Sequence, residues 1–354
     1  MKVLVLGGTG AMGVHLVHFL AGNGVETVVT TRESRSSEGK IRFVKGNAHD
    51  DEFLKLLLRE SWDAIIDFMV YKTNAFEKRV NLFLDATLQY VFLSSARVYA
   101  NSESPITEVS PRLLDSIEDK EFLETDEYSL TKARQEDILK FSGRTNWTVI
   151  RPYITYSENR LQLGVLEKEE WLYRALRGRT IVFSSDINSK LTTMTYGSDV
   201  AMGIMGIIGN PMAIGEVFHI TVQEQMTWNE VLSIYLSALE KYLGQRPRVL
   251  LQDLKTFMES KPAKYQIMYD RMFNRHFDNS KISRYVDVNK FRLLNDGLNH
   301  CVESFLQNPK FDKINWTQEA LKDRQTKERA SLNEIPGLKQ KVKYFMIRYF
   351  DCFL

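Results

Sequence analysis

The stretch KVLVLGGTGAMG, residues 2–13, joins a short apolar run to a turn rich in glycine. KVLVL is too short for a helix, and its uninterrupted apolar character is typical of a strand buried on both faces of a parallel sheet. Apolar residues at helical spacing follow and stop at Gly22 and Gly24, which predicts a helix. The stretch therefore predicts the first strand, turn and helix of an α/β fold.

Three glycines of this turn, Gly7, Gly10 and Gly13, are spaced three residues apart. Between a strand and a helix, such glycines let the backbone approach a diphosphate, and the helix N-terminus offers free N–H groups to the anion. A second strand starts about 20 residues further on, as a dinucleotide-binding unit requires. A purely structural turn is the alternative. The residues expected to contact the dinucleotide are Gly7, Thr9, Gly10, Met12 and Gly13.

Strands alternate with helices in the first half of the chain. Apolar runs predict further strands over 25–31, 41–47, 63–70, 89–95 and 147–152, with helical patterns between most of them. This alternation predicts a Rossmann-type, doubly wound parallel sheet with right-handed crossovers.

The alternation loosens after residue 155, which predicts three parts. A nucleotide-binding domain spans 1–155, and later segments, about 192–222, return to it. A smaller, interleaved α/β domain over 156–310 is discontinuous and is expected to bind the substrate. Residues 311–354 are expected to form a charged helical extension.

The residues after the second strand indicate which dinucleotide binds. An acid there would bind the ribose 2′-hydroxyl, but TTRESR carries Arg32 and Arg35 instead. A guanidinium can hold a 2′-phosphate through two parallel hydrogen bonds. We therefore expect NADP(H) in preference to NAD(H), unless Glu33 turns inward. Asn47, after the third strand, is expected near the adenine.

The fifth predicted strand ends in SSARVY, which places Ser94 and Ser95 at the carboxyl edge of the sheet, where ligands of open α/β folds bind. YSLTK lies on the next helix, and its Tyr128 and Lys132 share one face because they are four residues apart. Such pairs also occur by chance on surface helices. At this edge, however, Ser95 can polarise a carbonyl and Tyr128 can exchange a proton with it. The Lys132 ammonium favours the phenolate that this exchange requires.

These motifs resemble the extended short-chain dehydrogenase/reductase superfamily, and within it the NAD(P)-dependent epimerase/dehydratase family. The resemblance rests on the order of the glycine turn, SSARVY, YSLTK and RPYITY (151–156), and it runs from residue 1 to about 310. It implies hydride transfer at a hydroxyl or ketone of a nucleotide sugar, with Ser95, Tyr128 and Lys132 as the catalytic triad. It also implies cofactor contacts from four residues: Ser94, Tyr128, Lys132 and Pro152.

The resemblance leaves the reaction open between a net oxidoreductase, which is the leading hypothesis, and an epimerase that oxidises a carbon transiently. Dehydratase chemistry is not expected, because Ala96 and Arg97 stand where dehydratases carry an Asp-Glu pair. The fourth strand ends in DFMVY (67–71) instead of His-x-Ala-Ala, a departure similar to the chloroplast stem-loop-binding proteins. A non-catalytic or RNA-binding member is therefore a further alternative.

Four residues near the strand edge are expected to contact the substrate: Arg97, Arg151, Tyr153 and Arg160. Of these, Arg151 and Arg160 are the candidates for holding a diphosphate. Other partners are not expected. The net charge of +2 creates no strong field for nucleic acid, and the six histidines lack the spacing of metal ligands. Two cysteines, no signal peptide and no apolar stretch of ~18 to 20 residues predict a cytoplasmic protein.

The end of the chain carries two patterns. Residues 317–330 are rich in charge and predict a solvated helix. An apolar stripe at helical spacing follows among lysines, formed by Leu338, Val342, Phe345, Met346, Tyr349 and Phe353. We expect this amphipathic segment to dock on its own domain or on the second subunit of a homodimer. An anionic membrane surface is the other partner that it would fit.

Overall fold

The computed structural model describes residues 1–350, so Cys352 and Phe353 lie outside the described residues. The chain divides into two compact units. The first consists of Met1–Ser157, Thr193–Gln225 and Arg275–Leu294, and the second of Glu158–Thr192, Met226–Asn274 and the chain from Asn295 onward. The division differs from the predicted domains in two places, because residues 275–294 belong to the first unit and residues 311–350 belong to the second.

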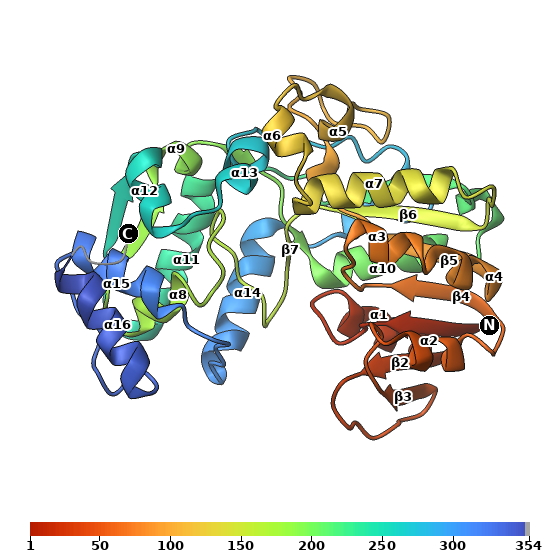
Figure 1. Ribbon diagram of the computed structural model, residues 1–354, viewed down its shortest axis with the longest axis horizontal. Coiled ribbons are helices and arrows are strands. Elements are labelled where there is room, and N and C mark those ends of the chain that lie inside the picture. The colour runs from red at the N-terminus through yellow and green to blue at the C-terminus, as the bar shows by residue number, and fades with distance from the viewer. Residues whose placement is uncertain (351–354) are drawn as a thin grey trace. The chain divides into compact units, whose positions relative to one another are not determined.

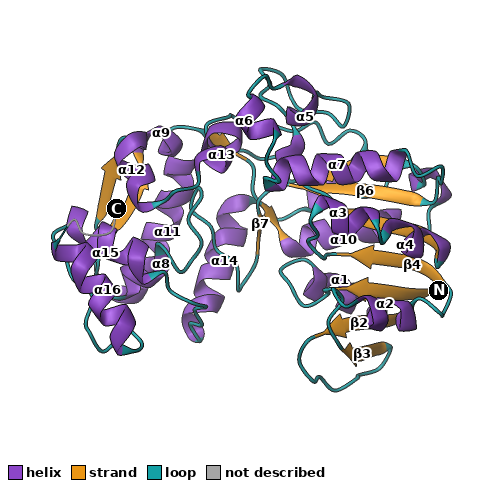
Figure 2. Ribbon diagram, viewed as in Figure 1, coloured by secondary structure: helices purple, strands orange, loops and turns teal. Residues whose placement is uncertain are grey.

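A seven-stranded sheet forms the centre of the first unit, and every pair of neighbouring strands in it is parallel (Figure 2). The strands are β1 (Lys2–Leu6), β2 (Glu26–Thr31), β3 (Ile41–Lys45), β4 (Trp62–Asp67), β5 (Thr87–Leu93), β6 (Trp147–Pro152) and β11 (Glu216–Ile220). Their order in the sheet is β11-β6-β5-β4-β1-β2-β3, which reverses direction at β1. The predicted doubly wound, Rossmann-type sheet is confirmed.

Helices cover both faces of this sheet (Figure 1). One face packs against α1 (Gly13–Gly22) and α10 (Gly197–Ile207), and the other packs against α2 (Asp51–Leu57), α3 (Thr73–Glu77), α4 (Val80–Asp85) and α7 (Tyr128–Lys140). Successive side chains of a strand point to opposite faces, so Leu4 and Leu6 join the core under α2–α4 and α7, while Val5 faces α1. This two-sided burial explains the uninterrupted apolar run of β1.

The connection from β5 to α7 contains three short helices: η1 (Ala96–Val98), α5 (Leu113–Ser116) and α6 (Lys120–Leu123). The first unit also contains β7 (Thr155–Tyr156), and its later segments add β10 (Thr195–Tyr196), η2 (Pro211–Ala213), η4 (Ile282–Arg284) and η5 (Val288–Lys290). Among these, β7 and β10 pair in parallel, directly after β6.

The second unit is a smaller α/β structure with two short ladders. In these, β8 (Ile181–Ser184) pairs in parallel with β13 (Val249–Gln252), and β9 (Leu191–Thr192) pairs antiparallel with β12 (Met226–Thr227). Its helices are α8 (Leu172–Leu176), α9 (Ser185–Asn188), α11 (Trp228–Leu243), α12 (Leu254–Ser260), α13 (Lys264–Gln266), η3 (Ile267–Arg271), α14 (Leu294–Gln307), α15 (Trp316–Gln325) and α16 (Leu338–Tyr349).

The charges of α15 are buried, so the prediction of a solvated helix is wrong. Glu319, Lys322 and Asp323 are buried, and the acids accept hydrogen bonds from Arg174 at 2.9 and 2.8 Å. Arg174 is buried as well, and its Nε donates to the carbonyl of Thr180. The partners are 145 and 149 residues apart in the chain, a separation that no local pattern reveals. Mutual pairing and hydrogen bonding offset the cost of removing these charges from water.

Replacing Arg174 by Ala should lower the free energy of unfolding by about 3–5 kcal/mol, because Glu319 and Asp323 would lose a buried counter-ion. Urea titrations followed by tryptophan fluorescence measure this change. Arg177→Ala is the matched control, because Arg177 follows the same helix but is exposed. A loss in R174A no larger than that of the control would contradict a stabilising role for the buried cluster.

Candidate functional site

The turn between β1 and α1 fits the diphosphate of a dinucleotide. Gly7 has φ of +72°, a backbone conformation that side chains disfavour, and a Cβ at Gly13 would lie 2.7 Å from the backbone of Gly8. A Cβ at Gly10 would meet nothing within 4 Å, so backbone is open to a ligand there. No side chain caps α1 at Met12, and within its first turn the Val14 N–H donates to the Gly10 carbonyl at 3.1 Å. The N-terminus of the helix still offers its partial positive charge to an anion.

The end of β2 carries positive charge at an exposed position. Arg32 follows the strand directly and is exposed, while the Glu33 carboxylate lies 3.8 Å from Arg35. Burial, together with the guanidinium groups of Arg79 and Arg32, lowers the pKa of His49. The positive charges of Arg32 and Arg79 therefore lie near His49, at the end of the sheet where a Rossmann-type fold binds the adenosine ribose. The predicted Asn47 is exposed there, and its side chain accepts a hydrogen bond from the backbone of His49.

The two serines after β5 are buried and differ in their partners. Ser94 Oγ donates to Glu136 Oε1 at 2.5 Å. Ser95 Oγ accepts from the Arg97 backbone N–H at 3.2 Å, which begins η1. This contact uses a lone pair of Ser95 and leaves its hydroxyl proton to be donated elsewhere.

Two cations lie close to the phenol of Tyr128, the first residue of α7. The Arg97 guanidinium lies 5.2 Å from the centre of its ring, and Lys132 Nζ lies 6.0 Å from the same centre. Glu127, which caps α7, pairs with Arg97 and holds it beside the ring. Positive charge near a phenol stabilises the phenolate, so the arrangement favours a tyrosine that can give and take a proton.

Lys132 is buried, and its ammonium donates to the Leu93 carbonyl at the end of β5 at 2.7 Å. Burial lowers the pKa of Lys132 to about 8, while the charges of Asp67 and Glu136 oppose that decrease. Lys132 also lies 4.5 Å from the Phe92 ring centre, which adds a cation–π contact. The lysine is therefore an enclosed cation whose charge depends on two buried carboxylates.

Asp67 is a feature of the site that the sequence analysis did not identify as functional. It ends β4 opposite Leu6 of β1, at the point where the strand order reverses. Burial raises the pKa of Asp67 to about 6, although its carboxylate accepts hydrogen bonds from Tyr90 Oη at 2.7 Å and Met69 N at 2.9 Å. In the sequence, the unusual end of the fourth strand, DFMVY, was the only indication of this residue. The effect of the Asp67 charge on Lys132 became visible only in the structure.

Arg151, a predicted diphosphate ligand, is buried and has its guanidinium paired within the protein. It is 1% exposed, and its guanidinium donates to both carboxylate oxygens of Glu136 at 2.8 and 2.5 Å and to the Glu108 carbonyl at 3.1 Å. Glu136 also holds Ser94, so the ion pair positions the residue before Ser95. Glu136 lies four residues after Lys132 on α7, a spacing that identifies a shared face but not the partner.

The remaining predicted residues lie in different places. Pro152 pairs with Ile220 at the end of β6, and the buried Tyr153 packs against Phe277 with ring centres 5.3 Å apart. Met12 Sδ accepts a hydrogen bond from Thr155 of β7. Arg160 belongs to the second unit, where it is exposed and lies 3.7 Å from Glu167. The structure thus gathers most of the predicted groups in the first unit, whereas Arg160 belongs to the second unit.

Within residues 1–350, no group of three or more His, Cys, Asp or Glu side chains is arranged to hold a metal ion. No helix in the same range has the length and apolar character to cross a bilayer.

Asp67→Asn should change how the free energy of unfolding depends on pH. A carboxyl whose pKa rises from 3.8 to about 6 on folding contributes stability that is present below about pH 4 and is lost as pH rises through about 6. Relative to the wild type, D67N should therefore gain roughly 2–3 kcal/mol between about pH 4 and pH 7. Urea unfolding at a series of pH values measures the difference.

Asp199 offers a comparison for this experiment, because burial raises its pKa to about 6 as well. Asp199→Asn, on α10, should change the pH dependence of the free energy of unfolding in the same direction. A difference between D67N and the wild type that stays constant across this range would contradict the buried, protonatable state of Asp67.

Comparison with known proteins agrees with this fold. The family model described as "NAD dependent epimerase/dehydratase family" matches residues 3–221. The chloroplast stem-loop binding protein of 41 kDa b of Arabidopsis thaliana is 24% identical over 244 residues, 64% of this chain and 60% of that protein. UDP-glucose 4-epimerase of Streptococcus mutans is 28% identical over 169 residues, 41% of this chain and 48% of that protein. The chain thus spans about half to three fifths of these curated relatives.

Solved structures share the fold. UDP-glucuronic acid 4-epimerase from Bacillus cereus, solved with UDP-glucuronic acid and NAD, superposes with a TM-score of 0.64 over 87% of this chain and 99% of its own, at 17% identity. The family match covers well over half of the chain, and it includes the glycine turn, both serines, Tyr128 and Lys132. The chain belongs to the NAD dependent epimerase/dehydratase family.

Proposed function

We propose that this protein is an NAD(P)-dependent enzyme that oxidises and reduces a hydroxyl-bearing carbon of a nucleotide sugar, with epimerisation as the net result. The observation that carries the proposal is the position of Tyr128, flanked by Lys132 and Arg97, at the carboxyl edge of a sheet whose first turn fits a diphosphate. Family membership supports the cofactor class, and the printed names of the relatives support the substrate class.

The reacting groups of the chain would divide the work at the sugar oxygen. The bound nicotinamide would accept or return the hydride. Ser95 would donate its free hydroxyl proton as a hydrogen bond to the sugar oxygen, and Tyr128 would remove or restore the proton on that oxygen. Lys132 and Arg97 would stabilise the phenolate while the proton is on the substrate.

The glycine turn and the N-terminus of α1 would hold the diphosphate of the cofactor, and Arg32 would lie near its adenosine ribose. Lys132 would donate to the nicotinamide ribose in addition to the Leu93 carbonyl, since an ammonium has three donors. We place the reaction in the cytoplasm, because a chain with two cysteines suits a reducing compartment.

The net outcome distinguishes an epimerase from a reductase. An epimerase returns the hydride to the same sugar, so the amount of oxidised cofactor stays constant over many turnovers. A net oxidoreductase converts one cofactor for each substrate. Incubation with UDP-glucose or UDP-glucuronic acid, followed by chromatography of the sugars and by the absorbance of reduced nicotinamide, separates the outcomes. Stoichiometric cofactor conversion would support the reductase instead.

Tyr128→Phe should lower kcat by about 10²- to 10⁴-fold, because it removes the proton donor and acceptor while keeping the ring. Cofactor affinity, measured by calorimetry, should change little. Tyr285→Phe is the matched control, because its hydroxyl bonds the Met212 carbonyl and lies outside the proposed site. Turnover in Y128F equal to that in Y285F would reject Tyr128 as the proton-transfer residue.

Arg32→Gln should weaken NADP⁺ binding by roughly 10- to 100-fold and leave NAD⁺ binding nearly unchanged, because the charged hydrogen bonds to the 2′-phosphate are lost. Calorimetric titration of both dinucleotides measures this. Arg35→Gln is the control. This substitution removes the same charge, but from a side chain that pairs with Glu33. Equal affinity of the wild type for both dinucleotides would assign Arg32 no part in cofactor choice.

RNA binding is the second candidate, because one relative is named for binding a stem-loop. The near-neutral charge of this chain, +2, gives little electrostatic attraction to a phosphate backbone. Strong, steeply salt-dependent binding to a stem-loop RNA, without binding of either dinucleotide, would favour this candidate over the enzyme.

A further inference from the structure

Helix α16 of the second unit has two apolar faces. Tyr344 and Ile347 are buried on one face, and the Tyr344 hydroxyl donates to Asp323 at 2.6 Å and accepts from Ala330 N at 2.8 Å. A second apolar stripe lies on the opposite side of the helix, since helical spacing turns each residue by about 100°. This α16 stripe consists of Leu338, Val342, Phe345 and Tyr349, which are 78%, 54%, 48% and 48% exposed.

Helix α16 contacts the rest of the second unit through Tyr344 and Ile347 and still presents the α16 stripe to solvent. An exposed apolar row of this length on a soluble unit marks a surface that another structure covers.

Basic residues border the α16 stripe on both sides. By helical position, Lys339 and Lys343 lie along one border, and Lys341 and Arg348 lie along the other. The helix contains no acidic residue. None of these four side chains forms an ion pair with another residue in the range 1–350. The helix therefore presents four basic side chains around an apolar centre, of which Arg348 is half-buried and also donates from Nε to the Glu328 carbonyl at 2.8 Å.

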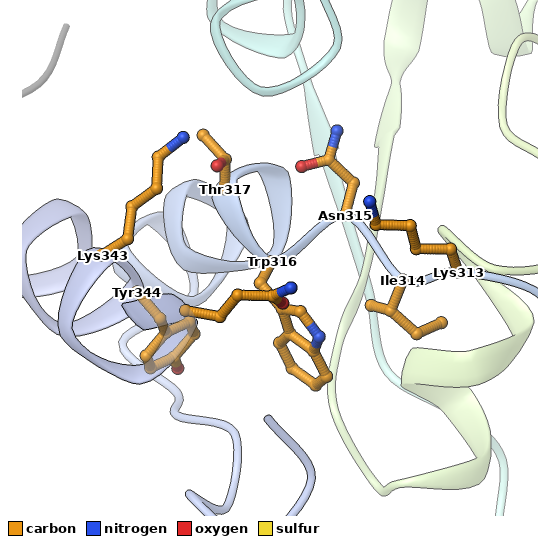
Figure 3. A pocket seen from close by; sticks show the side chains of 8 residues that line it. Lys313, Ile314, Asn315, Trp316, Thr317, Lys343 and Tyr344 are labelled. Atoms are coloured by element: carbon orange, nitrogen blue, oxygen red, sulfur yellow. The ribbon is translucent and has the colours of Figure 1, made fainter. Parts of the chain in front are cut away.

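A groove beside α16 extends the basic border. It has a volume of about 440 Å³ and is lined by Lys313, Ile314, Asn315, Trp316, Thr317, Gln340, Lys343 and Tyr344. Lys313 and Lys343 line this groove from two different segments (Figure 3). Lys313 lies in the loop that precedes α15, and Lys343 lies on α16. The positive charge on this side is thus contributed by the folded unit as well as by one helix.

The charges decide which partner fits the stripe. A second copy of the chain would bring two sets of basic borders together without acids between them, and like charges repel. An anionic bilayer supplies the opposite charge to both borders and an apolar layer for the stripe. With 12 residues, α16 is about 18 Å long, so it would lie in the plane of the surface.

We propose that α16 is an interfacial helix that binds this protein to a membrane surface rich in anionic lipid. The α16 stripe enters the headgroup region, and the bordering Lys339, Lys341, Lys343 and Arg348 contact lipid phosphates. This inference is independent of the proposed enzymatic function, because it involves the second unit alone.

Co-sedimentation of the full chain with vesicles tests the proposal. Vesicles of phosphatidylcholine with about one third phosphatidylglycerol should bind the protein, and vesicles of phosphatidylcholine alone should bind it far more weakly. Binding to the anionic vesicles should weaken as salt increases, because added ions screen the basic borders. Equal binding to both vesicle types would overturn the proposal.

Two double variants separate the apolar and the charged contributions. Val342→Ser with Phe345→Ser should weaken vesicle binding by at least roughly tenfold, because both side chains leave the interface. Val109→Ser with Phe141→Ser makes the same chemical changes in the first unit, where these residues are 92% and 85% exposed, and should bind as the wild type does. Binding by V342S/F345S as strong as by this control would overturn the proposal.

The second double variant, Lys339→Gln with Lys341→Gln, removes two charges. It should weaken vesicle binding by roughly 25-fold, because each lysine contributes a factor of about five. Lys255→Gln with Lys310→Gln removes the same charge from exposed positions elsewhere in the second unit and is the control. Because these lysines are exposed or half-exposed, the variants keep the test decisive even if V342S/F345S does not fold. A dimer in light scattering that only V342S/F345S disrupts, without vesicle binding by the wild type, would assign the stripe to a second copy instead.

Discussion

An ammonium group enclosed by protein at the carboxyl edge of the sheet loses its hydration, and the first unit is arranged to compensate that loss. The Leu93 carbonyl accepts a hydrogen bond from Lys132, the Phe92 ring faces it, and the buried carboxylates of Asp67 and Glu136 act on it from β4 and α7. These contributions keep a cation beside Tyr128 without leaving it to solvent, where its effect on the phenol would be screened.

The same carboxylates organise the strand ends around this cation. Glu136 accepts from Ser94 and from Arg151, so the residue before Ser95 is tied to both α7 and β6. Asp67 sits at the reversal of strand order and is hydrogen-bonded by Tyr90 and Met69. Buried polar networks of this kind restrict the positions of their members, which is what a proton-transfer site requires.

The second unit also contains a buried network of charged and polar groups, which holds the end of the chain. Arg174 joins α8 to the acids of α15, and Tyr344 connects α16 to Asp323, so the end of the chain is held to the unit by buried hydrogen bonds. This anchoring uses one face of α16 and leaves the α16 stripe exposed. A candidate catalytic site in the first unit and a candidate membrane-binding helix in the second can therefore coexist in one chain.

The glycine turn, the apolar strands and the order of the motifs were sufficient to predict the doubly wound sheet, because strand burial and turn geometry are local properties of the sequence. The Tyr128–Lys132 pair was identifiable for the same reason, since helical spacing determines which residues share a face. Interactions between residues distant in the chain could not be identified in this way. The pairing of Arg151 with Glu136, the placement of Asp67 near Lys132 and the burial of α15 depend on which charges meet when separate segments pack together. Only the tertiary structure decides this, because a charged residue has the same local pattern whether it faces solvent or a buried counter-ion.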